Sequence, residues 1–324
     1  MTFMKNEKQK TVLALGELLI DFTCVEMDAD GFPTMAAHPG GAPANFLAAV
    51  AKFGGKAEFI GKVGNDAFGR ALKSKMEACG IGTEGTVVSD EVFTTLAFVT
   101  LDESGDREFS FARKPGADTC LNTEEIKTEL LEKADVFHFG TLSLTHEPAK
   151  SATVAAVSKA KKAGCLISFD PNLRKPLWDD LERAKEAMLW GLQQADIVKI
   201  SDEEAEFLFG LEPEKALQEI FERYPVKLLY VTCGKEGAYF KNERASGFVP
   251  ALKDIKVVDT TGAGDIFGGS AMWRFLEKNK SPEALTEQEL CDIVRFATAS
   301  AGLSATKAGG ISSVPSLAEV LERM

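Results

Sequence analysis

A glycine-rich stretch in the last quarter of the chain combines an anion-binding pattern with a carboxylate. The segment VVDTTGAGDIFGGS, residues 257–270, places Gly262 and Gly264 between a short apolar run and a helix-like sequence. Glycines in such a turn let backbone N–H groups converge on an anion, and the start of the following helix adds about half a positive charge. Asp265 follows directly, and a resting carboxylate repels phosphate. The stretch therefore predicts either a plain glycine turn or a phosphate site whose carboxylate has a separate chemical role.

A dinucleotide-binding fingerprint is the competing functional interpretation of this stretch. The G-x-G-x-x-G pattern requires glycine at its sixth position, where the sequence starting at Gly262 has Phe267. No early strand-turn-helix unit carries the fingerprint either. The spacing argues against a nicotinamide-dependent oxidoreductase.

A second glycine stretch, HPGGAPANFLAAVAKFGG at residues 38–55, precedes another helix-like segment. The pair Gly40 and Gly41 would allow ligand hydroxyls to approach backbone N–H groups closely. Asn45 lies in the expected first helical turn and offers both a donor and an acceptor. The structural alternative is an ordinary helix start after a glycine-proline turn.

Polar residues follow several other short apolar runs. Asp21 follows GELLI, where a carboxylate could accept two hydrogen bonds from sugar hydroxyls or be solvated. Asp170, Asn172 and Arg174 follow CLISF, and an arginine there could hold a phosphate or carboxylate bidentately. A further small-residue loop contains Thr232, Gly234 and Gly237. Together these groups predict a cleft shared by a polyhydroxylated ligand and a phosphate-bearing ligand.

The elements that must position these residues alternate between two types. The strand-like runs are strongly apolar: TVLALG, AEFIGKV, DVFHFG, CLISFD, ADIVKI and KLLYVTC. Helix-like stretches lie between them, at residues 44–53, 147–163, 179–194 and 214–223. Apolar strands alternating with helices predict a doubly wound α/β fold around a mostly parallel sheet. Such sheets bind ligands at the carboxyl ends of their strands, where the polar residues above are found.

Two segments interrupt the alternation, at residues 22–38 and 93–113. Both carry strand-like pieces and turn signals without an intervening helix, which predicts a small antiparallel β lid at the edge of the sheet. We find no linker and no internal repeat, so residues 11–324 are expected to form one domain after a flexible tail at residues 1–10.

The composition excludes several classes of function. The 324 residues carry a net charge of −12 and no dense Lys/Arg cluster, which argues against nucleic acid or acidic membranes as partners. The six cysteines form no CxxC pair and the three histidines are dispersed, so neither a zinc site nor a Ser-His-Asp triad is expected. The start of the chain lacks a signal-peptide pattern, and no apolar run approaches the ~18 residues of a membrane span. We therefore expect a cytoplasmic protein.

Two long motifs carry a resemblance to a known family. They are GGAPANFLAAVAKFGGKAEFIGKVGNDAFG, from Gly40, and DTTGAGDIFGGSA, from Asp259. Across residues 12–315 the sequence closely resembles the ribokinase-like carbohydrate kinases, the PfkB family. Within that family it is most similar to the fructokinase branch, through FARKPGAD, FDPNLRKPLW and VKISDEEAEFL.

The resemblance implies a catalytic role for the first glycine stretch. Asp265 matches the general base that takes a proton from the sugar hydroxyl as this hydroxyl attacks the γ-phosphoryl group of ATP. The backbone N–H groups of Gly262, Ala263 and Gly264 match the anion hole that stabilises the transferred group.

The resemblance also implies three sets of binding residues. The sugar-binding set is Asp21, Gly40, Gly41, Asn45, Arg113, Asp170 and Arg174. The nucleotide-binding set is Ser201, Thr232, Gly234, Gly237 and Thr298. Glu204 matches an acid that orients hydrated Mg²⁺, and a monovalent cation, expected to be K⁺, would be bound around Asp259, Thr261, Ser304, Lys307, Gly309 and Ser313.

The sequence departs from the family pattern in two places. The N-x-x-E acid motif of the family reads Ser201-Asp202-Glu203-Glu204, which puts the role of the asparagine in question. In RKPGAD, Lys114 stands where fructokinases often carry asparagine, which puts the sugar affinity in question.

Three functions stay open at this point. The first is an ATP-dependent fructokinase that produces fructose 6-phosphate. The second applies the same chemistry to 2-keto-3-deoxygluconate, whose carboxylate Arg113 and Arg174 could pair with, because DPNLR…LW also resembles that branch. The third is a non-catalytic sugar-binding regulatory protein, against which the intact Asp265, glycine loop and Glu204 argue. The resemblance also allows a homodimer.

Overall fold

The apolar runs form a nine-stranded main sheet within residues 9–101 and 107–324, the part of the chain that the computed structural model describes. Its strand order is β13-β12-β11-β10-β9-β8-β1-β4-β5. The parallel strands are β1 (Thr11–Leu15), β4 (Lys56–Gly64), β5 (Ile81–Ser89), β8 (Val136–Gly140), β9 (Leu166–Asp170), β10 (Ile197–Ser201) and β11 (Leu228–Thr232). The antiparallel strands at one edge are β12 (Gly237–Asn242) and β13 (Ser246–Pro250). The predicted mostly parallel sheet is confirmed.

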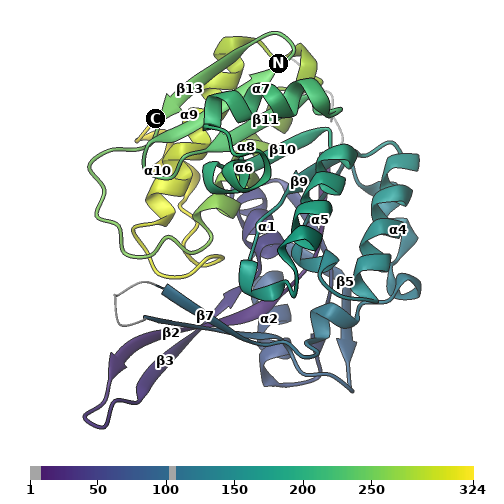
Figure 1. Ribbon diagram of the computed structural model, residues 1–324, viewed down its shortest axis with the longest axis vertical. Coiled ribbons are helices and arrows are strands. Elements are labelled where there is room, and N and C mark those ends of the chain that lie inside the picture. The colour runs from purple at the N-terminus through teal and green to yellow at the C-terminus, as the bar shows by residue number, and fades with distance from the viewer. Residues whose placement is uncertain (1–8, 102–106) are drawn as a thin grey trace, which may run out of the picture.

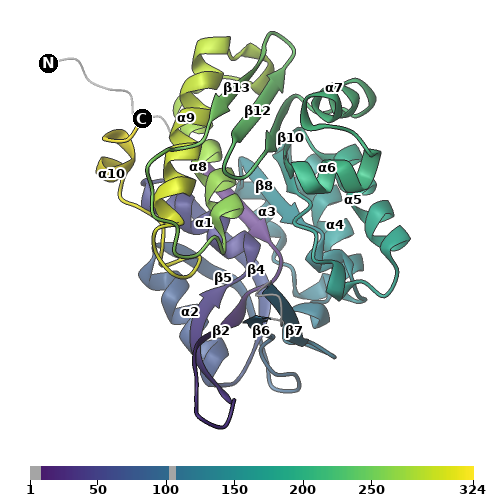
Figure 2. The same ribbon diagram turned by 60° about the vertical axis from the view of Figure 1, so that its left-hand side comes forward.

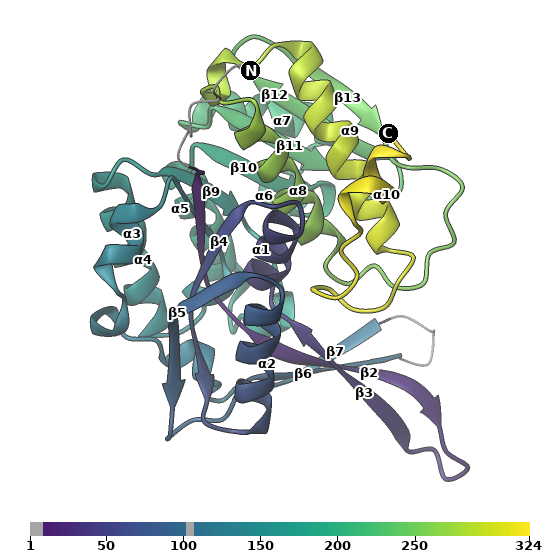
Figure 3. The same ribbon diagram turned by 180° about the vertical axis from the view of Figure 1, so that it is seen from behind.

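Helices cover both faces of this sheet (Figures 1 and 3). One layer contains α1 (Ala42–Lys52), α2 (Ala67–Ala78), α8 (Ala263–Glu277), α9 (Glu287–Ser304) and α10 (Leu317–Leu321). The other contains α3 (Thr128–Lys133), α4 (Ala149–Lys162), α5 (Leu181–Gln194), α6 (Asp202–Phe209) and α7 (Pro213–Arg223). Short 3₁₀ helices are η1 (Ala117–Cys120), η2 (Thr123–Glu125), η3 (Leu142–Leu144), η4 (Lys175–Leu177) and η5 (Pro282–Ala284). The two-sided covering confirms the doubly wound fold.

The central strands show why the sequence runs are apolar rather than alternating. In β1, Val12 and Ala14 belong to the core under α1 and α8, whereas Leu13 and Leu15 belong to the core under α3 and α4. Successive side chains of a strand point to opposite faces, so a strand covered on both faces must be apolar at every position. Each position of β1 is buried accordingly.

A small second sheet lies across the open end of the main sheet (Figures 1 and 2). It contains β3 (Pro33–Gly40), β2 (Leu19–Met27), β6 (Leu96–Leu101) and β7 (Arg107–Ala112), in that order. The pairs β2–β3 and β6–β7 are antiparallel hairpins, and the hairpins join through a parallel pairing of β2 with β6. The turn between β6 and β7 lies outside the described residues, as does most of the predicted tail at residues 1–10.

The layout brings the carboxyl edge of the main sheet against the small sheet. The strands β2 and β3 extend further toward the main sheet than the sequence predicts, so that Leu19 pairs with Gly40 and Asp21 with His38. This places Gly40, Gly41 and the start of α1 beside β2. In the described part of the chain, no helix combines the length and apolar character of a membrane span.

Candidate active site

A cleft of about 260 Å³ opens between the carboxyl edge of the main sheet and the small sheet. It is lined by residues of β2, α1, β7, the loop after β9, β10, α6 and the first turn of α8. The predicted site residues that line it are Asp21, Gly41, Asn45, Arg174, Ser201, Glu204, Thr261, Gly262, Gly264 and Asp265. Predicted residues from five separate parts of the sequence therefore meet in one place.

Asp265 is held in this cleft by two amide groups. It lies in the first turn of α8 and is 7% exposed. Asn45 Nδ2 donates to its Oδ2 at 2.9 Å, and Asn172 Nδ2 donates to its Oδ1 at 2.7 Å. Burial raises the pKa of Asp265, against the hydrogen bond from Asn45 and the positive charges of Lys199 and Arg174. A carboxylate with a raised pKa and a fixed orientation is suited to accept a proton.

The N-terminus of α8 presents backbone to the same cleft. Gly262 is the N-cap residue, with φ of 75°, and no side chain in the described residues caps this helix end. A Cβ on Gly262 would lie 2.9 Å from Asn45 Nδ2 and 3.0 Å from the Cα of Gly310, so both the φ and the space require glycine. The N–H of Ala263 donates to the carbonyl of Thr260 at 3.2 Å. The open helix end can attract an anion through its remaining N–H groups and its dipole.

The glycine pair before α1 is required by its neighbours. A Cβ on Gly40 would lie 2.0 Å from Asp21 Oδ2, and one on Gly41 would lie 2.4 Å from the carbonyl oxygen of Glu17. Burial raises the pKa of Asp21 to about 7, opposed by the charge of Arg174 and reinforced by Asp265. The backbone of Gly40 and Gly41 and the half-buried carboxylate of Asp21 together form a surface suited to hydroxyl groups.

Asn45 has one hydrogen-bonding atom to spare. Its Nδ2 is bonded to Asp265, whereas its Oδ1 is buried without a hydrogen-bond partner among the described residues. A buried unpaired acceptor is costly unless a ligand or water satisfies it. A ligand hydroxyl beside Asp265 would do so.

Three of the predicted sugar-binding residues, Gly40, Arg113 and Asp170, do not line the cleft. The side chain of Arg113 is 2% exposed and forms an ion pair with Asp118, with Nη2 2.7 Å from Oδ2. Nε also donates to Asp118 Oδ2, at 2.9 Å, while Nη1 donates to Thr145 Oγ1 and Nη2 donates in addition to the carbonyl of Leu142, both at 2.9 Å. Asp170 lies behind the cleft, where its Oδ2 is 3.0 Å from Lys199 Nζ. Arg113 and Asp170 each form a buried ion pair in this structure.

The predicted nucleotide-binding residues extend from the cleft toward the antiparallel edge of the sheet. Ser201, at the end of β10, lines the cleft and pairs with Thr232 of β11. Gly234 and Gly237 form the turn from β11 to β12, with φ of 48° and 137°. Thr298 lies in α9, where its hydroxyl donates to the carbonyl of Arg295. Of this set, only Ser201 lies in the cleft itself.

Glu204 lines the cleft from α6 and has structural partners. Its Oε2 accepts from the N–H of Ser201 at 2.9 Å in a capping box, and its Oε1 accepts from the N–H of Leu173 at 2.7 Å. The carboxylate thereby links the start of α6 to the loop that carries Asn172. Carboxylate oxygens keep further lone pairs, so the arrangement fits an acid that hydrogen-bonds the water shell of a divalent cation.

Two loops of the predicted monovalent-cation site are joined by Asp259. Its Oδ1 accepts from the N–H and hydroxyl of Thr261, at 2.9 and 2.7 Å, and its Oδ2 accepts from the N–H of Gly309 at 3.0 Å. The hydroxyls of Ser304 and Ser313 are buried near these loops and donate to backbone carbonyls. The side chain of Lys307 instead reaches Glu319.

The donor chemistry of these loops decides which ion they fit. No cluster of three His, Cys, Asp or Glu residues in the described chain could hold a metal ion. A site built from carbonyl and hydroxyl oxygens beside one carboxylate fits a hard monovalent cation rather than zinc.

The sequence motifs assign no role to three polar residues at the cleft. Glu17, whose Oε1 accepts from the N–H of Ala42 at 2.7 Å, and Lys199 both line it. The third is Asn172, which the sequence places in a polar loop but does not connect with Asp265, to which it donates a hydrogen bond. For Glu17 and Lys199 the available signal was a charged residue inside an otherwise apolar run, in LALGELLI and ADIVKI.

Comparisons with known proteins show which family the chain resembles over its length. The model of the family described as pfkB family carbohydrate kinase matches residues 9–317. Fructokinase-1 of Zea mays is 42% identical over 319 residues, covering 97% of both chains, and fructokinase-2 of Solanum lycopersicum is 39% identical over 315 residues, covering 96% of this chain and 94% of the relative.

Solved structures of similar proteins share the fold over their full length. A fructokinase from Xylella fastidiosa with bound ATP has a TM-score of 0.88 at 33% identity, covering 97% of this chain and 98% of the other. A fructokinase double mutant from Vibrio cholerae with fructose, ADP and potassium ion bound has a TM-score of 0.86 at 29% identity, covering 98% and 99%. With a family match over nearly the whole chain, this protein belongs to the pfkB family of carbohydrate kinases.

Proposed function

We propose that the protein is an ATP-dependent fructokinase that transfers the γ-phosphoryl group of ATP to the primary 6-hydroxyl of fructose. The observation that carries the proposal is the position of Asp265, fixed by Asn45 and Asn172 in the first turn of α8. A proton acceptor and a helix N-terminus then face one cleft, which is the pairing that phosphoryl transfer to an alcohol requires. The similarity to fructokinases over the full length supports fructose as the acceptor.

The reaction divides between these two parts. The 6-hydroxyl oxygen of fructose forms a bond to the γ-phosphorus while the bond from that phosphorus to the β,γ-bridging oxygen breaks, and ADP leaves. The hydroxyl proton passes to Asp265. The N-terminus of α8, from Gly262 to Gly264, stabilises the negative charge on the transferred group. Asp21, Asn45 and the backbone at Gly41 hold the sugar hydroxyls.

The metal ions proposed for the reaction are Mg²⁺ and K⁺. When bound, Mg²⁺ would neutralise charge on the ATP phosphates, and Glu204 is the residue that would hold its water shell. K⁺ would be held by the loops around Asp259 and Ser313, and it would stabilise the loop that precedes Gly262. The ATP base would lie along the turns at Thr232 to Gly237.

The small sheet is proposed to act as the lid. Val99 of β6 and Phe111 of β7 line the cleft, so this sheet contributes apolar surface directly over the site. Apolar groups there exclude water, which otherwise competes with the sugar for the phosphoryl group.

The structure leaves only one of the two arginines that the 2-keto-3-deoxygluconate alternative requires in the cleft. It invoked Arg113 and Arg174 as partners of a substrate carboxylate, but the guanidinium of Arg113 is bound to Asp118 and only Arg174 lines the cleft. We therefore expect the neutral sugar to be preferred.

A substrate panel tests the proposed function. Initial rates with ATP and Mg²⁺ are measured for fructose, ribose, glucose, adenosine and 2-keto-3-deoxygluconate. We expect the highest kcat/KM for fructose. A higher kcat/KM for 2-keto-3-deoxygluconate would establish the sugar-acid kinase instead, and absence of phosphoryl transfer to every acceptor would favour the non-catalytic alternative.

A further inference from the structure

Lys199 is a buried cation that points toward the catalytic helix. In β10, Val198 and Ile200 belong to the core on the α5 and α6 side, whereas Ile197 belongs to the core on the α1 and α8 side. By the alternation of a strand, Lys199 shares the face of Ile197 and points toward α8. Its side chain is 12% exposed and lines the cleft together with Asp265. The mechanism above gives this residue no role.

The ammonium lies directly beside the anion-binding end of α8. A Cβ on Gly264 would lie 3.1 Å from Lys199 Nζ, so the absence of a side chain on the second residue of the helix leaves room for the ammonium. A lysine charge and a helix N-terminus at this separation attract the same anion. The two features come from elements far apart in the sequence.

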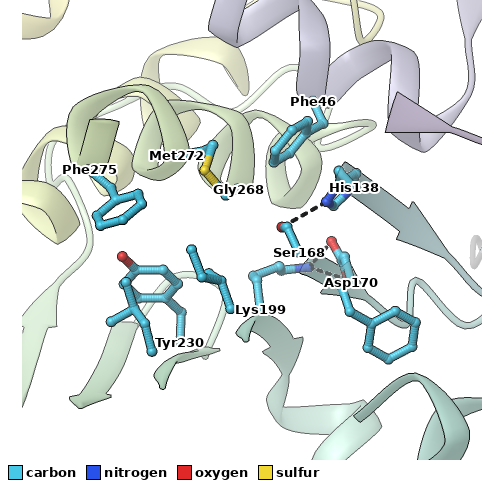
Figure 4. A pocket seen from close by; sticks show the side chains of 12 residues that line it. Phe46, His138, Ser168, Asp170, Lys199, Tyr230, Gly268, Met272 and Phe275 are labelled. Atoms are coloured by element: carbon cyan, nitrogen blue, oxygen red, sulfur yellow. Dashed lines mark hydrogen bonds and ion pairs between the residues drawn. The ribbon is translucent and has the colours of Figure 1, made fainter. Parts of the chain in front are cut away.

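One carboxylate holds the ammonium in place. Asp170 is its only hydrogen-bond partner among the described residues, with Lys199 Nζ donating to Oδ2 at 3.0 Å and to Oδ1 at 3.2 Å (Figure 4). Burial alone would lower the pKa of Lys199, but the negative charges of Asp170, Glu204 and Asp265 outweigh this and raise it. Lys199 therefore stays protonated and keeps donor capacity beyond its bond to Asp170.

Among the described residues, the space behind Lys199 offers it no anion besides Asp170. A cavity of about 10 Å³ lies there, with room for about one water molecule. It is lined by apolar groups such as Phe46 and Met272, and by His138, whose ring accepts or donates a hydrogen bond with Ser168 at 2.9 Å (Figure 4). Burial and the charge of Lys199 lower the pKa of His138 to about 3, so this ring is neutral. The cleft is the direction in which the ammonium can meet an anionic ligand.

We propose that Lys199 is a further catalytic residue, whose ammonium contacts the oxygens of the transferred phosphoryl group, and that Asp170 is its positioning residue. The proposal rests on the phosphoryl-transfer function proposed above. Lys199 remains protonated throughout, while the hydroxyl proton passes to Asp265 and the bond from the γ-phosphorus to ADP breaks. Asp170, expected from the sequence to contact the sugar, acts through Lys199 instead.

The competing explanation is that Lys199 only neutralises Asp170. Simple removal of Lys199 cannot separate the two, because it leaves a buried carboxylate unpaired and destabilises the fold. Two further variants do separate them. Asp170→Asn keeps the ammonium but removes its anchor, and the double variant Asp170→Asn/Lys199→Met removes both charges and leaves no unpaired ion.

The experiment measures kcat, the KM values for ATP and fructose, and the melting temperature of these variants. If Lys199 contacts the phosphoryl group, Lys199→Met loses about 10²–10³-fold in kcat, as for removal of one donor to a developing anion. The double variant recovers the melting temperature but not kcat, and it stays at least about tenfold slower than Asp170→Asn, which still has the ammonium. Lys199→Arg, which keeps the charge, exceeds Lys199→Met in kcat.

Lys175→Met is the matched control, because Lys175 is an exposed lysine in η4, next to the loop that carries Arg174, and it does not line the cleft. It should keep the wild-type kcat. A double variant that turns over as fast as Asp170→Asn or faster would overturn the proposal, since the buried charge would then matter only through its unpaired partner.

The inference and the proposed function can fail separately. If the wild-type protein prefers another sugar, fructose is wrong, and the same variants are compared with the preferred sugar. If the wild-type protein phosphorylates no acceptor, the function fails and the role of Lys199 fails with it. If fructose is phosphorylated and the double variant is not slower than Asp170→Asn, only the role of Lys199 is wrong.

Discussion

At the scale of single residues, the strongest prediction concerns Asp265. We expect Asp265→Asn to lose about 10²–10⁴-fold in kcat, because a positioned base typically contributes that much. An amide keeps the size of the side chain, so the affinities for fructose and ADP, measured by isothermal titration, should change little. Asp254→Asn, at an exposed carboxylate in the loop before the glycine stretch, is the control and should keep the wild-type rate. A kcat near that of the wild type in Asp265→Asn would show that another group takes the proton.

Two arginines that the sequence assigns to one role are expected to behave differently. Arg113→Met leaves the buried carboxylate of Asp118 unpaired, so the free energy of unfolding should fall by about 3–5 kcal/mol. Arg174→Met should instead raise the KM for fructose by about tenfold or more with little change in stability, since a hydrogen bond to a charged group contributes ~1.5–3 kcal/mol. Urea denaturation and initial rates, measured on both variants, test whether Arg113 affects stability and Arg174 affects fructose binding. Equal stability of the two would contradict it.

There is a physical reason why the sequence indicates some residues of the site and not others. Asp265 and Asn45 follow glycine turns at helix starts, and a helix start fixes which way its first residues face. Lys199 lies inside β10, and the face to which it points depends on strand register and on which helix packs there. Glu17 lies in the connection between β1 and β2, where no strand or helix period predicts a direction. The loop side chain of Arg113 could point to the sugar or to Asp118, and local sequence does not distinguish these.

At the scale of elements, the small sheet should control the entry of water. Phe111→Ala removes an aromatic ring that lines the cleft from β7, so we expect a lower kcat for transfer and a higher rate of ATP hydrolysis without sugar. Phe32→Ala is a matched control, because that ring is 71% exposed between β2 and β3 and does not line the cleft. Coupled assays of ADP release with and without fructose measure both rates. An unchanged ratio of the two rates in Phe111→Ala would contradict a water-excluding role.

The loops joined by Asp259 lead to a prediction about monovalent cations. We expect kcat/KM to rise with K⁺ in buffer otherwise free of monovalent metal ions, because a cation bound there stabilises the loop leading into Gly262. Asp259→Asn weakens the charge of the site, so it should raise the K⁺ concentration needed for half activation. The measurement is an initial-rate titration with KCl at constant ionic strength, with tetramethylammonium chloride as the balancing salt. Equal rates with both salts would argue against a cation site.

The periodicity of the sequence predicts the positions of helices well. It does not predict which strands of the small sheet pair with each other. The helices expected at residues 147–163 and 179–194 appear as α4 and α5 within two residues at each end, because their apolar stripe and flanking strands are local features. The parallel pairing of β2 with β6 joins segments more than 70 residues apart in the chain. No turn connects them, so pairing register and direction are set by tertiary packing, which includes α2 against β2, rather than by local sequence.

At the scale of the whole molecule, an overall negative protein concentrates its cations where the reaction needs them. The chain carries a net charge of −12, yet the cleft brings together Lys199 and Arg174 with the positive end of α8. Local charge rather than net charge therefore decides whether an anion such as ATP can bind. The homodimer that the resemblance allows stays a prediction.

The buried carboxylates of the cleft should make the stability of the whole fold depend on pH. Glu17 is buried, and burial raises its pKa from 4.5 to about 7, against hydrogen bonds that include one from the N–H of Ala42. The folded protein therefore holds a proton that the unfolded chain releases, and stability from this group is fully present below pH 4.5 and lost as the pH rises through 7.

Glu17→Gln cannot ionise and keeps the oxygen that accepts from Ala42, so it should not lose this stability. We expect the free energy of unfolding of the wild type, minus that of the variant, to fall by roughly 3 kcal/mol from acid to neutral pH, since each pKa unit is worth ~1.4 kcal/mol. Urea denaturation of both proteins across this range gives the difference, in which the pH dependence of all other groups cancels. The exposed residue Glu214, changed to Gln, serves as the control whose difference stays constant. If the difference in free energy of unfolding between the wild type and Glu17→Gln also stayed constant with pH, burial would not raise the pKa of Glu17. The positive charge of Arg113 would then have to balance the negative charges of both Asp118 and Glu17.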